Sequence, residues 1–121
     1  MLRPYSLVLG LKRAWRLQSE SDVQRVWQHG RSWAHPLLIL RARPNGLDQS
    51  RVAFVAGKKV GKAVTRNRAK RLMREVVRAR FLNIIPGYDL VLIGRSKIAE
   101  SSLTEVMGAI DQLLTRAKLL K

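Results

Sequence analysis

The sequence predicts an α/β (α+β) two-layer sandwich in which helices pack on a small central mixed sheet. Its 121 residues are 46% hydrophobic, which suits a single domain with one core across residues 1–121. There is no cysteine, so packing alone must hold this core. Apolar periodicity changes along the chain in the order helix, strand, strand, helix, strand, helix. Residues 1–16 are expected to form a basic, less ordered N-terminal arm.

The first half of the chain is predicted to contain one helix and two strands. A short helix follows the cap residues at 17–22 and ends at His29-Gly30. Two antiparallel strands are expected at 32–43 and 51–56, because apolar runs there lie on either side of the turn Asn45-Gly46.

The second half begins with a long basic helix over residues 62–81. A strand rich in β-forming residues follows at 88–94, and the last helix starts at a capping box formed by Ser102 and Glu105. The basic helix has one apolar arc that can pack on a core, formed by Ala69, Leu72, Met73, Val76, Val77 and Ala79.

The charge of the chain indicates a polyanionic partner. It has 24 Lys and Arg against 8 Asp and Glu, a formal charge of +16, and its cations gather on and before the basic helix. An ordinary solvated surface is the alternative, although such a dense positive face repels itself without an anion beside it. The residues expected to bind nucleic acid are Lys58, Lys59, Lys62, Arg66, Asn67, Arg68, Lys70, Arg71, Arg74 and Arg78.

The sequence predicts no catalytic residue, no metal-ligand set and no small-molecule substrate. His29 and His35 lack a third ligand nearby, and the acids are too scattered to hold two metal ions. No apolar run approaches the roughly 18 residues that span a bilayer, so we expect no membrane partner and a cytoplasmic protein. A transit peptide within the acid-free residues 1–16 is an alternative to a basic arm.

The run GKKVGKAVTRNRAKRLMR at residues 57–74 resembles the RNR signature of the bacterial ribonuclease P protein component. The resemblance covers nearly the whole chain, because the residues around the first helix, the strands and the last helix occur in the family's order. It implies a small basic subunit that binds a catalytic ribonuclease P RNA and precursor tRNA. The RNA then removes the 5′ leader in a Mg²⁺-dependent reaction, and the protein itself binds no cofactor. The resemblance also implies a left-handed crossover around the basic helix.

The same resemblance assigns roles to individual residues. Arg66, Asn67, Arg68, Lys70, Arg71 and Arg74 match the RNR positions, and Lys58, Lys59 and Lys62 match a basic loop. The expected leader cleft comprises Val23, Trp27, Arg41, Phe54 and Arg95. Val23 stands where family members often have Phe, and Arg41 where some members have Tyr, so leader contact here is expected to depend more on charge. Trp27 and Phe54 could stack on RNA or belong to the core.

Two other classes of function are compatible with a basic sandwich. A ribosomal or RNA-assembly protein would bind structured RNA without a processing role, and it would not need a cleft for a single strand. A cationic protein on acidic membranes would expose Trp and Leu along the rim of the basic helix.

If RNA phosphates supply the binding energy, affinity for RNA will fall steeply with salt. We expect a log–log slope of about −0.7 to −0.9 per neutralised phosphate. Binding titrations between roughly 50 and 200 mM salt measure this slope, and a nearly flat line would contradict the electrostatic interpretation.

Overall fold

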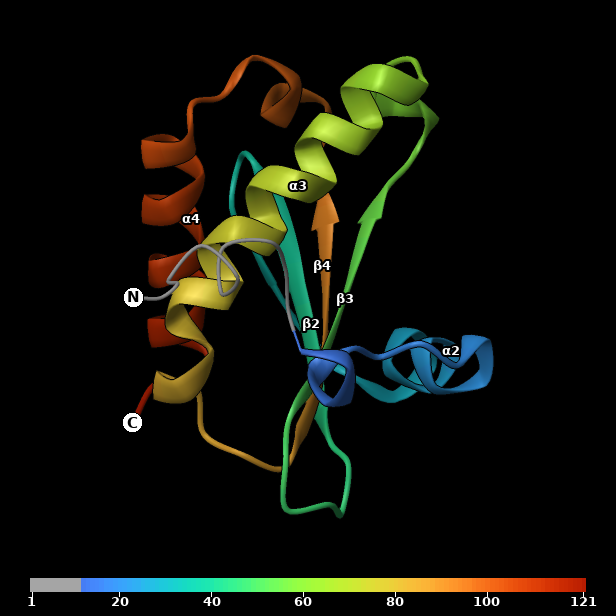
Figure 1. Ribbon diagram of the computed structural model, residues 1–121, viewed down its shortest axis with the longest axis vertical. Coiled ribbons are helices and arrows are strands. Elements are labelled where there is room, and N and C mark those ends of the chain that lie inside the picture. Colours follow the sequence, from blue (N-terminus) through green and yellow to red (C-terminus); the bar gives the residue numbers. More distant parts are fainter. Residues whose placement is uncertain (1–11) are drawn as a thin grey trace.

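The protein forms one four-stranded mixed sheet with helices on both faces (Figure 1). The computed structural model describes residues 12–121. The α+β class with a mixed sheet is therefore confirmed. The strands are β1 (Arg31–Ala34), β2 (Leu38–Pro44), β3 (Arg51–Ala56) and β4 (Tyr88–Gly94), and the helices are α2 (Glu20–His29), α3 (Ala63–Arg80) and α4 (Leu103–Arg116).

The predicted first strand at 32–43 is in fact two antiparallel strands, β1 and β2, joined by a tight turn. The backbone N–H of His35 donates to the carbonyl of Leu38 at 2.9 Å. Within the turn, the N–H of Leu37 donates to Nδ1 of His35 at 3.0 Å. Pro36 between them has no N–H and cannot continue a ladder, which is why the chain reverses here.

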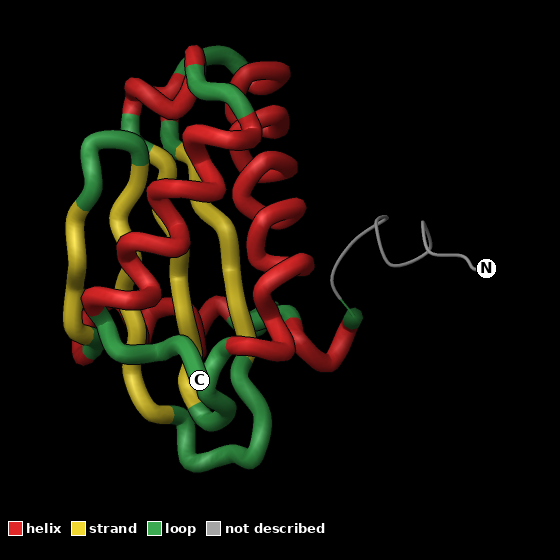
Figure 2. Tube along the Cα trace, turned by 90° about the vertical axis from the view of Figure 1, so that its left-hand side faces the viewer, coloured by secondary structure: helices red, strands yellow, loops and turns green. Residues whose placement is uncertain are grey.

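The strand order is β1-β2-β4-β3, so β4 lies between the two strands that flank the turn Asn45-Gly46. Strand β4 pairs antiparallel with β2 and parallel with β3. Thus β2 and β3 run in opposite directions, as predicted, but do not pair. Seen from the side of α3 and α4 with β3 and β4 pointing upward, the chain passes leftward from β3 through α3 to β4 (Figure 1 and Figure 2). This is the left-handed crossover implied by the resemblance, against the usual right-handed rule.

Alternation along the strands divides the core between the two faces of the sheet. Leu90 and Leu92 of β4 point into the larger core, which α3 and α4 cover. Val91 lies on the other face and packs with Val26 of α2 and Leu17. Helix α2 therefore lies opposite α3 and α4, on the far side of the sheet (Figure 1).

The helices use the apolar positions expected of them, with one exception. Ala69, Met73, Val76 and Val77 of α3 are buried, but Ala79 is exposed because it lies at the edge of the apolar arc, beyond the partly buried Leu72. The capping box of α4 is present.

The last residues of the predicted N-terminal arm, 13–16, belong to the fold. Residues 1–11 of the predicted arm lie outside the described part of the chain. Arg13–Trp15 form one turn of 3-10 helix, and Arg16 forms an isolated parallel β-bridge with Val52 of β3. Trp15 stacks on Phe81 with ring centroids 4.1 Å apart. This stacking holds the segment against the end of α3.

Shortening a core leucine should destabilise the fold far more than shortening a surface leucine. Leu92 is 1% exposed, whereas Leu82 is 73% exposed. We expect Leu92→Ala to lower the free energy of unfolding by about 2–5 kcal/mol, measured by urea denaturation. Leu82→Ala is the matched control and should stay within about 0.5 kcal/mol of the parent protein. Equal losses for the two variants would contradict the assigned core.

Candidate nucleic-acid interface

Helix α3 presents much of the predicted RNA-binding surface. Its apolar side packs on the sheet and α4, which leaves polar residues on the outer side. Lys62, Asn67 and Arg71 are exposed, and Arg66 and Lys70 are partly buried. The positive surface expected from the sequence is therefore present, while its contact with RNA stays a prediction.

Two arginines of the predicted surface are engaged within the protein. The guanidinium of Arg68 donates to the carbonyls of Ala99 and Ser101 at 3.2 and 2.9 Å. These bonds attach α3 to the segment that leads into α4, so Arg68 has a structural role whatever it does with RNA. Arg78 forms an ion pair with Glu75 one turn earlier.

A groove of about 580 Å³ lies on the α2 side of the sheet, between α2 and the basic loop before α3. Three aliphatic side chains, one from each of β2, β3 and β4, form its floor. Its lining combines residues from both predicted groups, the basic loop and the leader cleft. These residues are Trp27, Ile39, Val55, Gly57, Lys58, Lys59, Val60, Ile93, Gly94, Arg95 and Ser96.

An aromatic ring and three cations belong to this groove. Trp27 is 48% exposed, so the alternative that it is a core residue is wrong. Lys58, Lys59 and Arg95 are also exposed. An exposed aromatic face together with cations is the usual surface for single-stranded nucleic acid, because bases stack while phosphates meet positive charge.

Arg41, which was expected in the leader cleft, does not line the groove but holds the C-terminal end of α2 beside it. Its Nη2 donates to the carbonyls of Trp27 and Gly30 at 2.5 and 3.1 Å, and its guanidinium lies 5.7 Å from the Trp27 ring centroid. A cation satisfies the free carbonyls at a helix C-terminus and opposes the helix dipole. A Cβ on Gly30 would come within 2.4 Å of the Val26 carbonyl, so only glycine fits this close approach.

The start of α2 is attached to the sheet by a second arginine. Arg51 of β3 donates to both carboxylate oxygens of Asp89, from Nε at 2.9 Å and from Nη2 at 2.8 Å, and to Asp22 of α2 at 3.3 Å. Asn45 also donates to Asp89, at 2.9 Å. The hydrogen bond to Asp89 raises the pKa of Arg51 above its usual value. The buried carboxylate of Asp89 is thus fully paired.

Phe54 was wrongly grouped with the leader cleft. Its side chain packs on the larger core beneath α3, where the guanidinium of Arg74 lies 5.6 Å from its ring centroid. Trp27 and Val23 lie on the opposite side of the sheet, with Val23 packed against the smaller core. The position of Phe54 follows from strand alternation, since Val52 of the same strand also faces the larger core.

The aliphatic floor of the groove was missed at the sequence level. Ile39, Val55 and Ile93 are partly buried and belong to the face of the sheet that α2 covers. Alternation within each strand was the signal that could have found them, because their neighbours Leu38, Leu40 and Leu92 point to the other face.

The described residues contain no group of three His, Cys, Asp or Glu side chains that could hold a metal ion. Within 12–121, no helix is both long enough and apolar enough to span a bilayer.

Comparisons with known proteins identify the same family throughout. A family model described as Ribonuclease P matches residues 11–118. The ribonuclease P protein component of Roseiflexus sp. is 43% identical over 112 residues, which cover 92% of each chain. The Clostridioides difficile protein of the same name is 39% identical over 101 residues, covering 83% of this chain and 89% of its own.

Two solved structures agree with this result. The Staphylococcus aureus RNase P protein superposes with a TM-score of 0.81 and 26% identity, covering 90% of this chain and 100% of its own. The Thermotoga maritima RNase P protein superposes with a TM-score of 0.76 and 32% identity, covering 84% of this chain and 96% of its own.

Two arginines of α3 should respond differently to removal. Arg68→Ala breaks two bonds to backbone carbonyls and should lower the free energy of unfolding by about 1.5–3 kcal/mol. Arg71→Ala, at an exposed position on the same helix, should change it by less than about 0.5 kcal/mol. Thermal and urea unfolding of both variants measure the difference. Equal free energies of unfolding for the two variants would show that the Arg68 side chain does not attach α3 to the segment before α4.

Proposed function

Because the chain belongs to the bacterial ribonuclease P protein family, we propose that it binds a catalytic RNA and the 5′ leader of precursor tRNA. In this role it assists the RNA in the Mg²⁺-dependent endonucleolytic removal of the leader, in the bacterial cytoplasm. Its relatives are protein components of an endoribonuclease. The proposal assigns the cleavage chemistry to the RNA and the binding of substrate to the protein.

The observation that carries this proposal is the groove between α2 and the basic loop. It brings Trp27, Lys58, Lys59 and Arg95 around an aliphatic floor. A single strand can stack one base on an exposed indole and place its phosphates against the surrounding cations. Double-stranded RNA would instead require a surface that matches its A-form shape. A leader, which is single-stranded, therefore suits this groove.

The outer side of α3 is suited to the second partner, a large structured RNA. Lys62, Asn67 and Arg71 are exposed along one helix and offer donors to phosphates and 2′-hydroxyl groups. Arginine and asparagine make directional hydrogen bonds, whereas lysine acts as a point charge. We assign this surface to the catalytic RNA, which leaves the groove on the other side of the sheet for the leader.

The excess of positive charge has a role in this assignment. Bringing a leader beside a folded RNA gathers phosphates, and a chain of formal charge +16 screens their repulsion. Mg²⁺ ions held by the RNA would then be needed at a lower bulk concentration. A ribosomal or RNA-assembly protein would share the charge, but it would have no use for a single-strand groove.

The proposal predicts RNA-dependent cleavage of a precursor tRNA at its mature 5′ end. At low magnesium, a bacterial ribonuclease P RNA should cleave faster with this protein than without it, and the protein alone should not cleave. Gel analysis of 5′-labelled substrate measures both rates. Cleavage by protein alone would contradict the assignment of chemistry to the RNA, and tight RNA binding without stimulation would favour the ribosomal or assembly role.

A single substitution tests the groove within the same assay. Trp27→Ala should weaken binding of precursor tRNA to the protein–RNA complex by about 5- to 150-fold, the equivalent of one lost base stack. Binding of mature tRNA, which has no leader, should not change. Leu82→Ala removes another exposed apolar side chain and should leave both affinities intact.

A further inference from the structure

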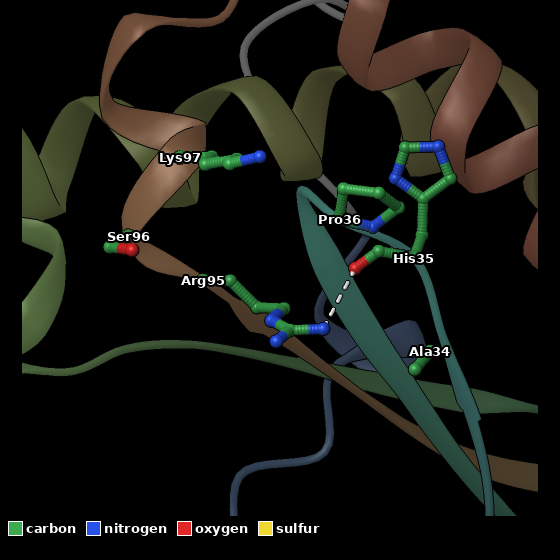
Figure 3. A pocket seen from close by; sticks show the side chains of 6 residues that line it. All are labelled: Ala34, His35, Pro36, Arg95, Ser96 and Lys97. Atoms are coloured by element: carbon green, nitrogen blue, oxygen red, sulfur yellow. Dashed lines mark hydrogen bonds between the residues drawn. The ribbon is translucent and has the colours of Figure 1, made fainter.

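A second hollow adjoins the groove at the end of the sheet. This hairpin pocket has a volume of about 340 Å³ and lies between the β1–β2 turn and the residues that follow β4 (Figure 3). Arg95 and Ser96 line both hollows, so the pocket continues the groove beyond the C-terminal end of β4. Its lining consists of Ala34, His35, Pro36, Arg95, Ser96 and Lys97.

We propose that the hairpin pocket binds a phosphodiester of the leader strand as that strand leaves the groove. The inference rests on the proposed function and extends it, because neither the β1–β2 turn nor Lys97 belongs to the predicted leader cleft. The proposed ligand is an RNA phosphate, held by Lys97 and Arg95.

The charge of the pocket suits an anion. Two cations, Arg95 and Lys97, line it together with one imidazole, and no carboxylate is among its lining residues. Figure 3 shows the Lys97 ammonium directed across the pocket toward Pro36 and His35, while Ser96 points away. A third cation, Arg116 of α4, donates to the carbonyl of Ala34 at 2.7 Å and adds positive charge beside the turn. Cations gathered without acids hold phosphate mainly by electrostatic attraction.

Hydrogen bonds within the protein join two walls of the pocket. The backbone N–H of Arg95 donates to the carbonyl of Leu37 at 2.9 Å, and its guanidinium donates to the carbonyl of His35 at 3.4 Å (Figure 3). These bonds join the β1–β2 turn to the end of β4. A rigid site loses less conformational entropy when it binds.

His35 shapes the turn and is not itself a ligand contact. Its Nδ1 accepts the N–H of Leu37 at 3.0 Å, and Figure 3 shows Nε2 on the side of the ring that faces away from Lys97 and Arg95. We therefore assign the phosphate contact to the two cations alone.

The test uses the protein–RNA complex and precursor tRNAs whose leaders increase in length by one nucleotide. For the parent protein, affinity should rise with leader length until the strand fills both hollows. With Lys97→Ala, affinity should stop rising before the leader reaches its full length in the pocket. The slope of log affinity against log salt should become smaller in magnitude by about 0.7, for long leaders only. Lys97→Arg should restore the slope, since it restores the charge.

The controls separate this proposal from the function on which it rests. Lys97 is exposed, and the hydroxyl of Ser101 donates to the backbone carbonyl of Lys97, a bond that does not involve the lysine side chain. The Lys97→Ala protein should therefore fold normally. Lys121→Ala removes a lysine from a separate hollow beside Trp15 and should have no leader-dependent effect. If Lys97→Ala lowers affinity equally for precursors with short and long leaders, or does not lower it, the proposal that the hairpin pocket binds a leader phosphate is overturned. A parent complex that shows no preference for any leader would instead overturn the proposed function.

Discussion

The position of α2 on the sheet is the constraint on which the groove depends. Arg51 joins Asp22, near the start of this helix, to the buried Asp89 of β4. At the other end, Arg41 donates to the carbonyls of Trp27 and Gly30. Between these attachments the helix buries only Val26 fully. Apolar contact alone would therefore leave the helix free to shift, and the two arginines hold Trp27 over the aliphatic floor.

The arginines of this chain divide into those that hold the fold and those that face outward. Arg51, Arg68 and Arg80 connect separate elements, the last through two bonds to Asp111 of α4 at 2.8 and 3.0 Å. Exposed Arg71 and Arg95 leave their charge at the surface. Three of the eight acids, Asp22, Asp89 and Asp111, pair with Arg51 or Arg80 across the contacts between elements. The groove and the outer side of α3 keep their positive charge, and this is the distribution an RNA-binding subunit needs.

Periodicity along the chain predicted most helices and strands, because local spacing decides which face of an element is apolar. It could not place β4 between β2 and β3, since strand order depends on contacts between distant residues. The turn at Pro36 was overlooked because apolar residues on both sides resemble one strand. Phe54 faces the α3 side of the sheet with Val52, which alternation along the strand predicts and the family resemblance alone does not. Arg41 and Arg68 were recognised as cations, but their backbone partners, far away in sequence, could only come from the folded structure.

The central claim is that a single RNA strand lies in the groove, apart from the surface assigned to the catalytic RNA. Photo-crosslinking tests this most directly, with a benzophenone side chain placed at Trp27 or, as a control, at exposed Gln112 of α4. In the complex with catalytic RNA and precursor tRNA, the Trp27 position should crosslink to the 5′ leader, and crosslinking should disappear with mature tRNA. The Gln112 position should give no leader crosslink. Crosslinks from Trp27 that map only to the catalytic RNA, or that persist without a leader, would contradict the account.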